Sequence, residues 1–350
     1  MKNNTVVLGF SGGIDSLVSG ILLKEQGYKV IGISLEMQNN NNKDLIYNLS
    51  KKLNIEHYFI DLKTEFKQNI INNFVDNYLS AKTPNPCTIC NDIIKWKHLI
   101  SFADKINAKY VATGHYINIK KQNNKYYIYK GIDKKKDQSY FLWRLNQEYL
   151  KRTISPLGTH NKSEVKKIAD KHGFNNLKKQ KESMSICFLN NNNYRDFIKK
   201  HLNNKHKSLE KGNVLDTNGN IIGQHSGIAN YTIGQKSGLK LTVNKKLAVS
   251  KINIDNNSLI VDETLNLYKD IFFIENFNFV DFNDIKSNNI TVLIRGLGIN
   301  PQKNVKLNMI NANLIQVKLQ DKAWAVAPGQ PAVFYINNKL IGGGYIKWTK

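Results

Sequence analysis

The chain has 350 residues, with 51 Lys and Arg against 27 Asp and Glu, and its formal net charge at pH 7 is +24. This length allows two or three domains, each with its own core. No apolar run reaches the length of a membrane span and no signal peptide is evident, so we expect a cytoplasmic protein without a membrane partner. The three cysteines are an odd number, which argues against a disulfide framework. The positive charge favours a polyanionic partner, although a compositional bias can also produce the lysine and asparagine enrichment of this sequence.

The first half of the chain alternates predicted strands and helices. Strands are expected at residues 6–10, 29–35, 55–62 and 109–114, and helices at 43–53, 65–79 and 92–106. This alternation predicts an α/β domain with a parallel sheet covered by helices, and ligands bind such sheets at the carboxyl ends of the strands. A hairpin at 117–130 and helices at 161–172 and 193–202 follow, the former with a capping box made by Asn161 and Glu164.

Beyond residue 203 the sequence becomes β-like, with short apolar segments separated by Gly, Asn and Asp turns. The expected strands are 212–215, 221–223, 231–233, 248–254, 259–261, 272–277, 290–295, 312–319, 323–327, 332–336 and 339–345. We therefore predict three domains: an α/β catalytic domain with a helical extension (1–203), a small β-rich central domain (204–264) and a C-terminal β-barrel (265–350). Neither β-rich domain carries an evident catalytic cluster, so both are expected to serve recognition.

The segment Ser11-Gly12-Gly13-Ile14-Asp15-Ser16 lies between an expected buried strand and an expected helix. Two glycines permit a tight turn whose amide N–H groups point into one concavity, and the helix adds its positive N-terminal end. Ser11 and Ser16 supply hydroxyl donors, and Asp15 is a candidate ligand for the Mg²⁺ that accompanies a phosphate. No Gly-Lys-Ser/Thr follows, so this is not a Walker loop.

This loop resembles the SGGxDS loop of the PP-loop ATP pyrophosphatases, which bind the pyrophosphate of ATP and adenylate a substrate. Adenine is expected to rest against a residue at the end of the second strand, and the backbone after the fourth strand is expected to approach the nucleotide. The candidate ATP-binding residues are Gly9, Phe10, Ser11, Gly12, Gly13, Ile14, Asp15, Ser16, Leu35 and Gly114.

All three cysteines lie in two predicted loops. Cys87 and Cys90 have CxxC spacing in a loop stiffened by two prolines, and Cys187 lies in the second loop. Asn91 is predicted to cap a helix that begins at residue 92, which would place Cys90 beside a helix N-terminus that favours a nucleophilic thiolate. The alternatives are a cysteine buried as a small hydrophobic residue and a zinc site, but three cysteines without an obvious fourth ligand fit zinc poorly.

Motifs along nearly the whole chain together resemble the tRNA-specific 2-thiouridylases (MnmA-type). In order from Val6 to about Ile346 they are SGGIDS, TPNPCTICNDIIKW, ATGHY, KDQSYFL, SPLG, ESMSICF, NYRDF, YTIGQKSGL, APGQPAVFY and GGGYI. The resemblance implies a transferase that replaces O2 of the wobble uridine of Lys, Glu and Gln tRNAs with sulfur. ATP would activate that oxygen as an adenylate, with release of AMP and pyrophosphate.

The resemblance also implies roles for individual residues. The cysteine that matches Cys187 carries a persulfide delivered by a cysteine desulfurase or sulfur-relay protein. The cysteine that matches Cys90 attacks this persulfide, and the two can end as a disulfide. The target base must leave the anticodon stack. The positions that match base contacts are Asn85, Pro86 and Cys87, and those that match tRNA contacts are His115, Lys136, Asp137, Gln138, Arg295, Gly296 and Gln330.

Two positions depart from the family pattern. Many members carry aspartate where this chain has Cys87, and a cysteine replaces a carboxylate only as a thiolate. The set Cys87, Cys90 and Cys187 also resembles the three-cysteine set of iron–sulfur-dependent PP-loop thiolation enzymes, so a [4Fe–4S] cluster remains an alternative. Arg295-Gly296 stands where the family often has Arg-Tyr, which removes a stacking contribution.

Two readings from other classes remain open. A PP-loop ligase acting on a small molecule, as in argininosuccinate or GMP synthesis, would use the SGGIDS loop but neither cysteine loop. A non-catalytic RNA-binding protein that kept a nucleotide fold would use neither the loop nor the cysteines. Thiolation of tRNA uses all of these features, and the sequence therefore favours it.

Overall fold

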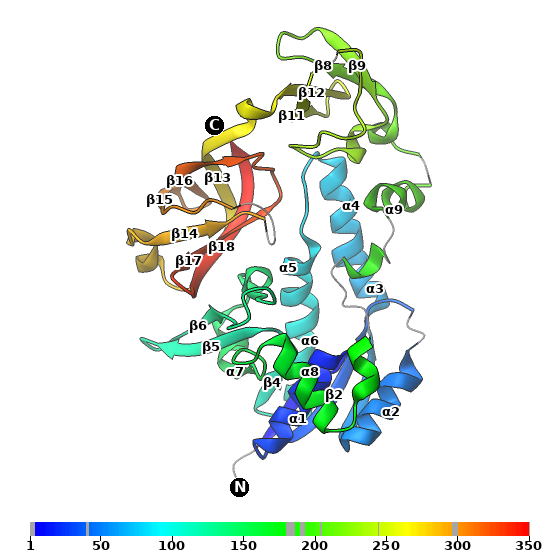
Figure 1. The fold of residues 1–350 in the computed structure, drawn as a ribbon, viewed down its shortest axis with the longest axis vertical. Helices are drawn as coiled ribbons and strands as arrows, with labels where there is room; N and C mark the ends of the chain where they lie inside the picture. The colour runs from blue at the N-terminus through cyan, green and yellow to red at the C-terminus, as the bar shows by residue number, and fades with distance from the viewer. Residues whose placement is uncertain are drawn as a thin grey trace. The chain divides into compact units, whose positions relative to one another are not determined.

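The structure is a computed structural model that describes residues 4–39, 42–179, 186–189, 193–203, 205–243, 245–295 and 300–349. The chain divides into two units (Figure 1). The first comprises Met1–Ile70, Cys87–Met184 and Asn338–Ile341, and the second comprises Ile71–Pro86, Ser185–Asn337 and Gly342–Lys350. Among the described residues, no helix combines the length and the apolar character needed to cross a membrane.

The first unit is built on a parallel five-stranded sheet with strand order β3-β2-β1-β4-β7. Its strands are β1 (Thr5–Gly9), β2 (Lys29–Glu36), β3 (Glu56–Asp61), β4 (Tyr110–Ala112) and β7 (Thr153–Ile154). Residues of β1 are almost completely buried, as expected for the apolar central strand of a sheet covered on both faces. The predicted α/β class is confirmed.

Helices lie on both faces of this sheet, as α1 and α6 show. The helices of the first unit are α1 (Ile14–Glu25), α2 (Lys43–Leu53), α3 (Lys63–Phe66), α5 (Pro86–Cys90), α6 (Lys97–Lys105), α7 (Gln147–Arg152) and α8 (Lys162–Lys171). Leu8 points toward Gly20 of α1, whereas the neighbouring Gly9 faces Leu99 of α6, so α1 and α6 lie on opposite faces. Apolar residues of α1, α2 and α8 share one core with β1. A capping box of Asn161 and Glu164 begins α8, as predicted.

The antiparallel hairpin of β5 (Ile117–Gln122) and β6 (Lys125–Lys130) completes the first unit. Residues 338–341 belong here because Lys339 pairs with Tyr129 of β6 and its ammonium group lies 4.4 Å from the centroid of the Tyr127 ring.

The second unit begins with two helices and a small sheet. The helices are α4 (Asn72–Leu79) and α9 (Tyr194–His201), and the sheet has the order β10-β9-β8-β12-β11. Its strands are β8 (Gly212–Leu215), β9 (Ile221–His225), β10 (Lys240–Leu241), β11 (Leu247–Asn253) and β12 (Ser258–Glu263). Residues from these strands, together with Ile228 and Tyr231, form a separate apolar core.

A larger sheet follows in the order β14-β17-β18-β13-β16-β15. Its strands are β13 (Tyr268–Phe279), β14 (Ile290–Leu293), β15 (Val305–Asn311), β16 (Leu314–Trp324), β17 (Pro331–Ile336) and β18 (Lys339–Thr349). The predicted fold class, an α/β domain followed by two β-rich parts, is therefore confirmed.

Three predicted elements were wrong in detail. Residues 231–233 follow a short 3₁₀ helix as a turn, and β10 supplies the pairing partner of β9 instead. Residues 312–319 and 323–327 are not two strands, because β16 runs through the polar residues between them. The strand β15 was missed, although its residues alternate between apolar and polar from Val305 to Met309; the four residues after Leu307 are all exposed.

Candidate functional site

The SGGIDS loop connects β1 to α1, as expected. Gly12 has φ +77°, in the left-handed region that suits glycine, and a Cβ there would lie 2.7 Å from Cγ1 of Ile46. Gly13 is the N-cap of α1, and no side chain caps the helix there. The Ser16 hydroxyl donates to the Gly13 carbonyl (2.9 Å) and accepts from the Ser11 amide (3.2 Å), which closes the loop. An uncapped N-terminus of a 12-residue helix behind a glycine turn suits a phosphate.

Gly114 brings the end of β4 against this loop. A Cβ at residue 114 would lie 2.9 Å from the Asp15 carbonyl carbon and 2.9 Å from the Ser16 nitrogen, both backbone atoms. Any larger residue would therefore displace the first turn of α1. This packing places Gly114 against the loop, and the expected approach of its backbone to the nucleotide itself stays a prediction.

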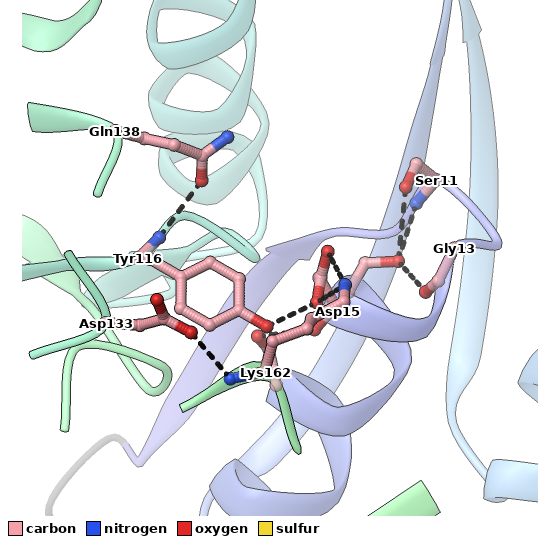
Figure 2. Close-up of polar contacts among 9 residues, drawn as sticks. Ser11, Gly13, Asp15, Tyr116, Asp133, Gln138 and Lys162 are labelled. Carbon is pink, nitrogen blue, oxygen red and sulfur yellow. Dashed lines mark hydrogen bonds and ion pairs between the residues drawn. The ribbon is translucent and has the colours of Figure 1, made fainter. Parts of the chain in front are cut away.

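The carboxylate of Asp15 is paired inside the protein (Figure 2). Lys162 Nζ lies 2.6 Å from Oδ1 and 2.8 Å from Oδ2 of Asp15, and the Tyr116 hydroxyl donates to Oδ1 over 2.7 Å. The Lys162 side chain is 11% exposed and that of Asp15 is 35% exposed. A buried ammonium group needs such a partner. The pair places one positive and one negative group beside the expected phosphate site.

The turn at residues 131–138 holds both partners of Asp15 (Figure 2). Gln138 Oε1 accepts from the Tyr116 amide (3.1 Å), and Asp133 Oδ2 accepts from the Lys162 amide (2.9 Å). Asp137 accepts from the Gly131 amide (3.0 Å) and the Ser139 hydroxyl (2.8 Å), and burial raises the pKa of this carboxyl group. In the structure, Asp137 and Gln138 therefore hold the turn together.

His115 lies at the end of β4, beside this turn. Its Nδ1 is 2.8 Å from the Thr113 hydroxyl, and its ring centroid is 5.4 Å from that of Trp96. Burial, with a smaller contribution from the nearby Lys95 charge, lowers the pKa of His115 to about 3. The imidazole is therefore neutral at physiological pH, and any contact it makes with RNA would be a neutral hydrogen bond.

The structure corrects the expected environment of Cys90. The helix begins at Pro86, whose missing N–H suits a first helical position, and Cys90 is the last residue of α5 with helical φ and ψ of −59° and −41°. Asn91 is therefore not an N-cap; its side-chain Nδ2 donates to the Phe141 carbonyl over 3.1 Å. Cys90 is 6% exposed, and its Sγ lies 3.8 Å from Sδ of Met37, just after β2.

Cys87 and Cys187 lie in different units. Cys87 is half-buried, one helical turn before Cys90 on α5. Cys187 is exposed at the start of a short 3₁₀ helix (Cys187–Leu189). Phe188 anchors that segment, because its ring packs against Phe74 at 5.1 Å and Phe197 at 5.2 Å. Residues 182–185 of the ESMSICF motif lie outside the described part of the chain.

The remaining predicted RNA contacts fall into two groups. Asn85 and Pro86 stand at the beginning of α5, and Lys136 is half-buried in the 131–138 turn. In the second unit, Gln330 Nε2 donates to the Thr83 carbonyl (2.8 Å), and Arg295 lies over the Trp324 ring at 5.5 Å. Gly296 lies outside the described residues.

The start of α1 fits the phosphate groups of a nucleotide. Gly13 leaves the N-terminus of α1 without a side-chain cap, and Leu35 lies near the carboxyl end of β2. Over the part of the chain that the structure describes, no group of three His, Cys, Asp or Glu side chains is arranged to hold a metal ion. Because Asp15 is engaged by Lys162 and Tyr116, it would bind Mg²⁺ only by sharing or exchanging these partners.

Sequence reasoning missed Lys162, Tyr116 and Met37. Lys162 lies 147 residues from Asp15 in the sequence, and only its neighbour Asn161 was singled out, as a helix cap. Tyr116 belongs to the ATGHY motif, in which His115 drew attention because it ends a strand. One signal in the sequence could have pointed to Lys162. No Lys or Arg occurs between residues 4 and 23, so a cation that pairs with Asp15 must come from another part of the chain.

The fold and loop define the class of the protein as a nucleotide-binding α/β enzyme with two β-rich domains attached. Residues 4–191 match the family described as “tRNA methyl transferase HUP domain”, residues 195–263 its “PRC-barrel domain”, and residues 269–346 the “Aminomethyltransferase beta-barrel domain”. The chain thus combines a HUP domain, a PRC-barrel domain and a C-terminal β-barrel domain.

Curated relatives narrow this class to one family. The chain is 35% identical to tRNA-specific 2-thiouridylase MnmA of Amoebophilus asiaticus, over 99% of this chain and 96% of the relative. It is 36% identical to tRNA-specific 2-thiouridylase MnmA 3 of Bacteroides fragilis, over 97% of this chain and 93% of the relative. A solved structure, NMN synthetase from Francisella tularensis, is 18% identical over 59% of this chain and 79% of that chain, with a TM-score of 0.35. The chain belongs to the tRNA-specific 2-thiouridylase family.

Proposed function

We propose that this protein transfers sulfur to O2 of the wobble uridine of tRNA, with ATP as the activating substrate. The observation that supports this best is that the Cys90 thiol lies at the nucleotide edge of the sheet. Cys90 contacts Met37, which follows β2, and the SGGIDS loop follows the neighbouring strand β1. Carboxyl ends of neighbouring parallel strands meet at one edge, so the thiol and the loop share that edge within one unit.

The chemistry divides between an activating and a sulfur-transferring half. The uridine O2 attacks the α-phosphorus of ATP, the bond to the β-phosphate oxygen breaks, and pyrophosphate leaves. The N-terminus of α1, the hydroxyls of Ser11 and Ser16, and the Lys162 ammonium are the groups of this chain suited to a leaving pyrophosphate. Mg²⁺, when bound, would add charge neutralisation, with Asp15 as the candidate ligand.

In the second half, Cys187 carries the incoming sulfur as a persulfide. The Cys90 thiolate attacks the sulfur of Cys187, which forms a Cys90–Cys187 disulfide and releases hydrosulfide. Hydrosulfide attacks C2 of the base, and AMP leaves with the original oxygen. A thiol reductant then restores both cysteines. The exposure of Cys187 suits loading by a sulfur donor such as a cysteine desulfurase or relay protein.

The decisive experiment is reconstitution with ATP, a persulfide source and unmodified tRNA, followed by digestion and detection of 2-thiouridine. Cys90→Ser and Cys187→Ser are each expected to abolish thiolation, by at least about 10³-fold, because serine neither carries nor resolves a persulfide. Binding of tRNA should remain nearly normal in both variants. Thiolation by either variant contradicts the assigned roles, and pyrophosphate release that depends on a small metabolite without thiolated RNA would favour a ligase.

Cys87→Asp provides the matched control for the cluster alternative. The family often has aspartate at this position, so the persulfide route predicts that Cys87→Asp keeps thiolation. A cluster held by the three cysteines would lose a ligand and its activity. Iron and labile sulfide in anaerobically purified protein give a second readout, and full activity of iron-free protein would exclude the cluster.

A further inference from the structure

Tyr116 connects two parts of the first unit that the proposed function uses separately. Its side chain contacts the nucleotide loop, and its backbone contacts the 131–138 turn that carries the proposed tRNA contacts Lys136, Asp137 and Gln138. We propose that Tyr116 is a positioning residue, which orients Asp15 beside the nucleotide and couples tRNA binding at this turn to nucleotide affinity. This inference rests on the proposed function for the identity of the RNA.

The side-chain contact fixes a carboxylate that is otherwise partly exposed. Asp15 lies in the first turn of α1, and its side chain is 35% exposed. The Tyr116 hydroxyl donates to Oδ1 over 2.7 Å, and the residue is only 2% exposed, so the phenol has little freedom to move. A buried donor to a carboxylate restricts the carboxylate's orientation more than a flexible lysine alone does.

The backbone contact ties the same residue to the turn. The Tyr116 amide donates to Gln138 Oε1 (3.1 Å), and the Gln138 amide donates to the Tyr116 carbonyl (3.3 Å). Gly131 packs directly against this carbonyl, because a Cβ at residue 131 would lie 2.7 Å from the Tyr116 oxygen. A shift of the turn therefore moves the Tyr116 backbone with it.

A second route runs from the same turn to the same carboxylate. Asp133 Oδ2 accepts from the Lys162 amide (2.9 Å), and Lys162 Nζ contacts both oxygens of Asp15 at 2.6 and 2.8 Å. All three donor contacts made to Asp15 in Figure 2 thus come from residues that the 131–138 turn holds. Two routes converging on one carboxylate are the physical basis for coupling between the turn and the nucleotide site.

The test measures equilibrium binding, so that it does not depend on thiolation. The dissociation constant of a non-hydrolysable ATP analogue with Mg²⁺ is measured with and without unmodified tRNA, for wild type and for Tyr116→Phe. Tyr129→Phe is the matched control, because its hydroxyl also donates to a side chain, Gln122 Oε1, but on the β5–β6 hairpin. Phenylalanine keeps the ring of Tyr116 in the core, and a melting curve checks that the variant is folded.

We expect Tyr116→Phe to weaken binding of the analogue about tenfold, because the Asp15 carboxylate is no longer held by the phenol and must be ordered when the nucleotide binds. We expect tRNA to change the analogue's affinity in wild type, and this ratio to move at least about threefold toward one in Tyr116→Phe. Tyr129→Phe should match wild type in both measurements. By reciprocity, the analogue must change the affinity for tRNA by the same factor.

Each outcome has one meaning. A wild-type ratio of one, or an unchanged ratio in Tyr116→Phe, overturns the coupling, and unchanged affinity for the analogue overturns the positioning role. Failure of the wild-type protein to bind tRNA overturns the proposed function and the coupling with it. Asp133→Ala addresses the second route, and the double variant with Tyr116→Phe should abolish the coupling if both routes carry it.

Discussion

His57 is a half-buried histidine of the first unit that stays uncharged in the folded protein. It lies on β3, with its Nε2 2.9 Å from the Ser34 hydroxyl and its ring packed edge-on against Phe10 and Phe59. Its buried Nδ1 has no hydrogen-bond partner among the described residues. Burial lowers the pKa of His57 to about 4. The imidazole is therefore neutral in the folded protein and becomes charged more readily when the chain unfolds.

We expect this histidine to make folding stability depend on pH. The pKa of His57 is lower in the folded state than the unfolded value of about 6.5, so the unfolded state binds more protons between these values. The free energy of unfolding therefore falls as the pH drops from about 6.5 toward 4. In His57→Gln, the loss between pH 7 and pH 5 should shrink by about 1 kcal/mol, after allowance for partial solvent exposure. Urea unfolding at both pH values measures this, and an equal loss in both proteins would contradict it.

Single residues were predictable from sequence where neighbours in the chain supply the contact. The loop from Ser11 to Ser16 was recognisable because its glycines, hydroxyls and following helix are contiguous, and the Ser16–Gly13 hydrogen bond is local. The pairing of Lys162 with Asp15 could not be predicted in this way, because the two residues belong to different helices that only the fold brings together. The functional assignments of individual site residues remain predictions.

At the scale of elements, the turn at residues 327–330 and the segment before α5 form one contact within the second unit. The Thr83 amide donates to the Pro328 carbonyl (2.8 Å), and Gln330 donates to the Thr83 carbonyl. The Thr83 hydroxyl also contacts the Thr232 hydroxyl. Thr83 stands two residues before Asn85, the first of the proposed base-contacting residues, so these contacts join the β-rich part of the second unit to the segment that precedes α5.

Gly329 allows this approach, and its replacement tests it. Gly329 has φ +86°, and a Cβ there would lie 2.9 Å from Cβ of Lys82 and 3.1 Å from the Thr83 nitrogen. We expect Gly329→Ala to lower thiolation at least about tenfold, because the turn must move away from the segment. Gly219→Ala is the matched control, with φ +87° and no atom within 4 Å, so it bears only the backbone cost of about 1 kcal/mol.

Comparison of Gly329→Ala with Gly219→Ala separates the effect of backbone strain from the effect of the contact with residues 82–83. Both should lose similar stability in urea unfolding if backbone strain dominates, while only Gly329→Ala should lose thiolation. Equal thiolation by the two variants would show that the contact with residues 82–83 is not needed for activity.

Helices and strands were predicted well where their apolar residues formed a strong pattern. They were predicted poorly where contacts between distant segments decide the structure. The central strands β1 and β2 are largely apolar and were found within one residue. The start of α5 was misplaced because Asn91 was taken as a cap, whereas Pro86 begins the helix and a π-helical stretch (Asn91–Trp96) continues it. Asn91 is buried and bonded to Phe141, a contact between distant segments that no local rule reveals.

At the scale of the whole molecule, the order of predicted helices and strands was enough to predict the fold class. It was not enough to establish the residues at which the domains begin and end. The change from alternating helices and strands to strands alone identified the two β-rich parts. The boundaries at 203/204 and 264/265 stay predictions, because segments far apart in sequence join within each unit; residues 71–86, for example, belong with 185–337. The net charge of +24 likewise leaves open how many cations face RNA.

The salt dependence of tRNA binding tests whether the excess of positive charge contacts tRNA phosphates or only reflects a compositional bias of the sequence. If about five to eight cations contact phosphates, the logarithm of the association constant should fall with the logarithm of salt concentration with a slope of about −4 to −6. Between 50 and 200 mM salt this is a loss of about 10²–10⁴-fold in affinity. A slope near zero would mean that the lysine excess does not serve RNA binding.

Arg295 provides the residue-specific arm of this experiment. Its guanidinium lies over the Trp324 ring at 5.5 Å and donates to the Ala325 carbonyl at 2.5 Å, so its position is fixed, and Lys236 lies over the same ring at 5.2 Å. We expect Arg295→Gln to reduce the magnitude of the slope by about one, because one phosphate contact is lost. Lys251→Gln, which removes an exposed charge on β11, should leave the slope unchanged. Equal slopes for wild type and Arg295→Gln would remove Arg295 from the proposed tRNA contacts, and a reduced slope for Lys251→Gln would show that the charge acts as a diffuse field rather than through placed residues.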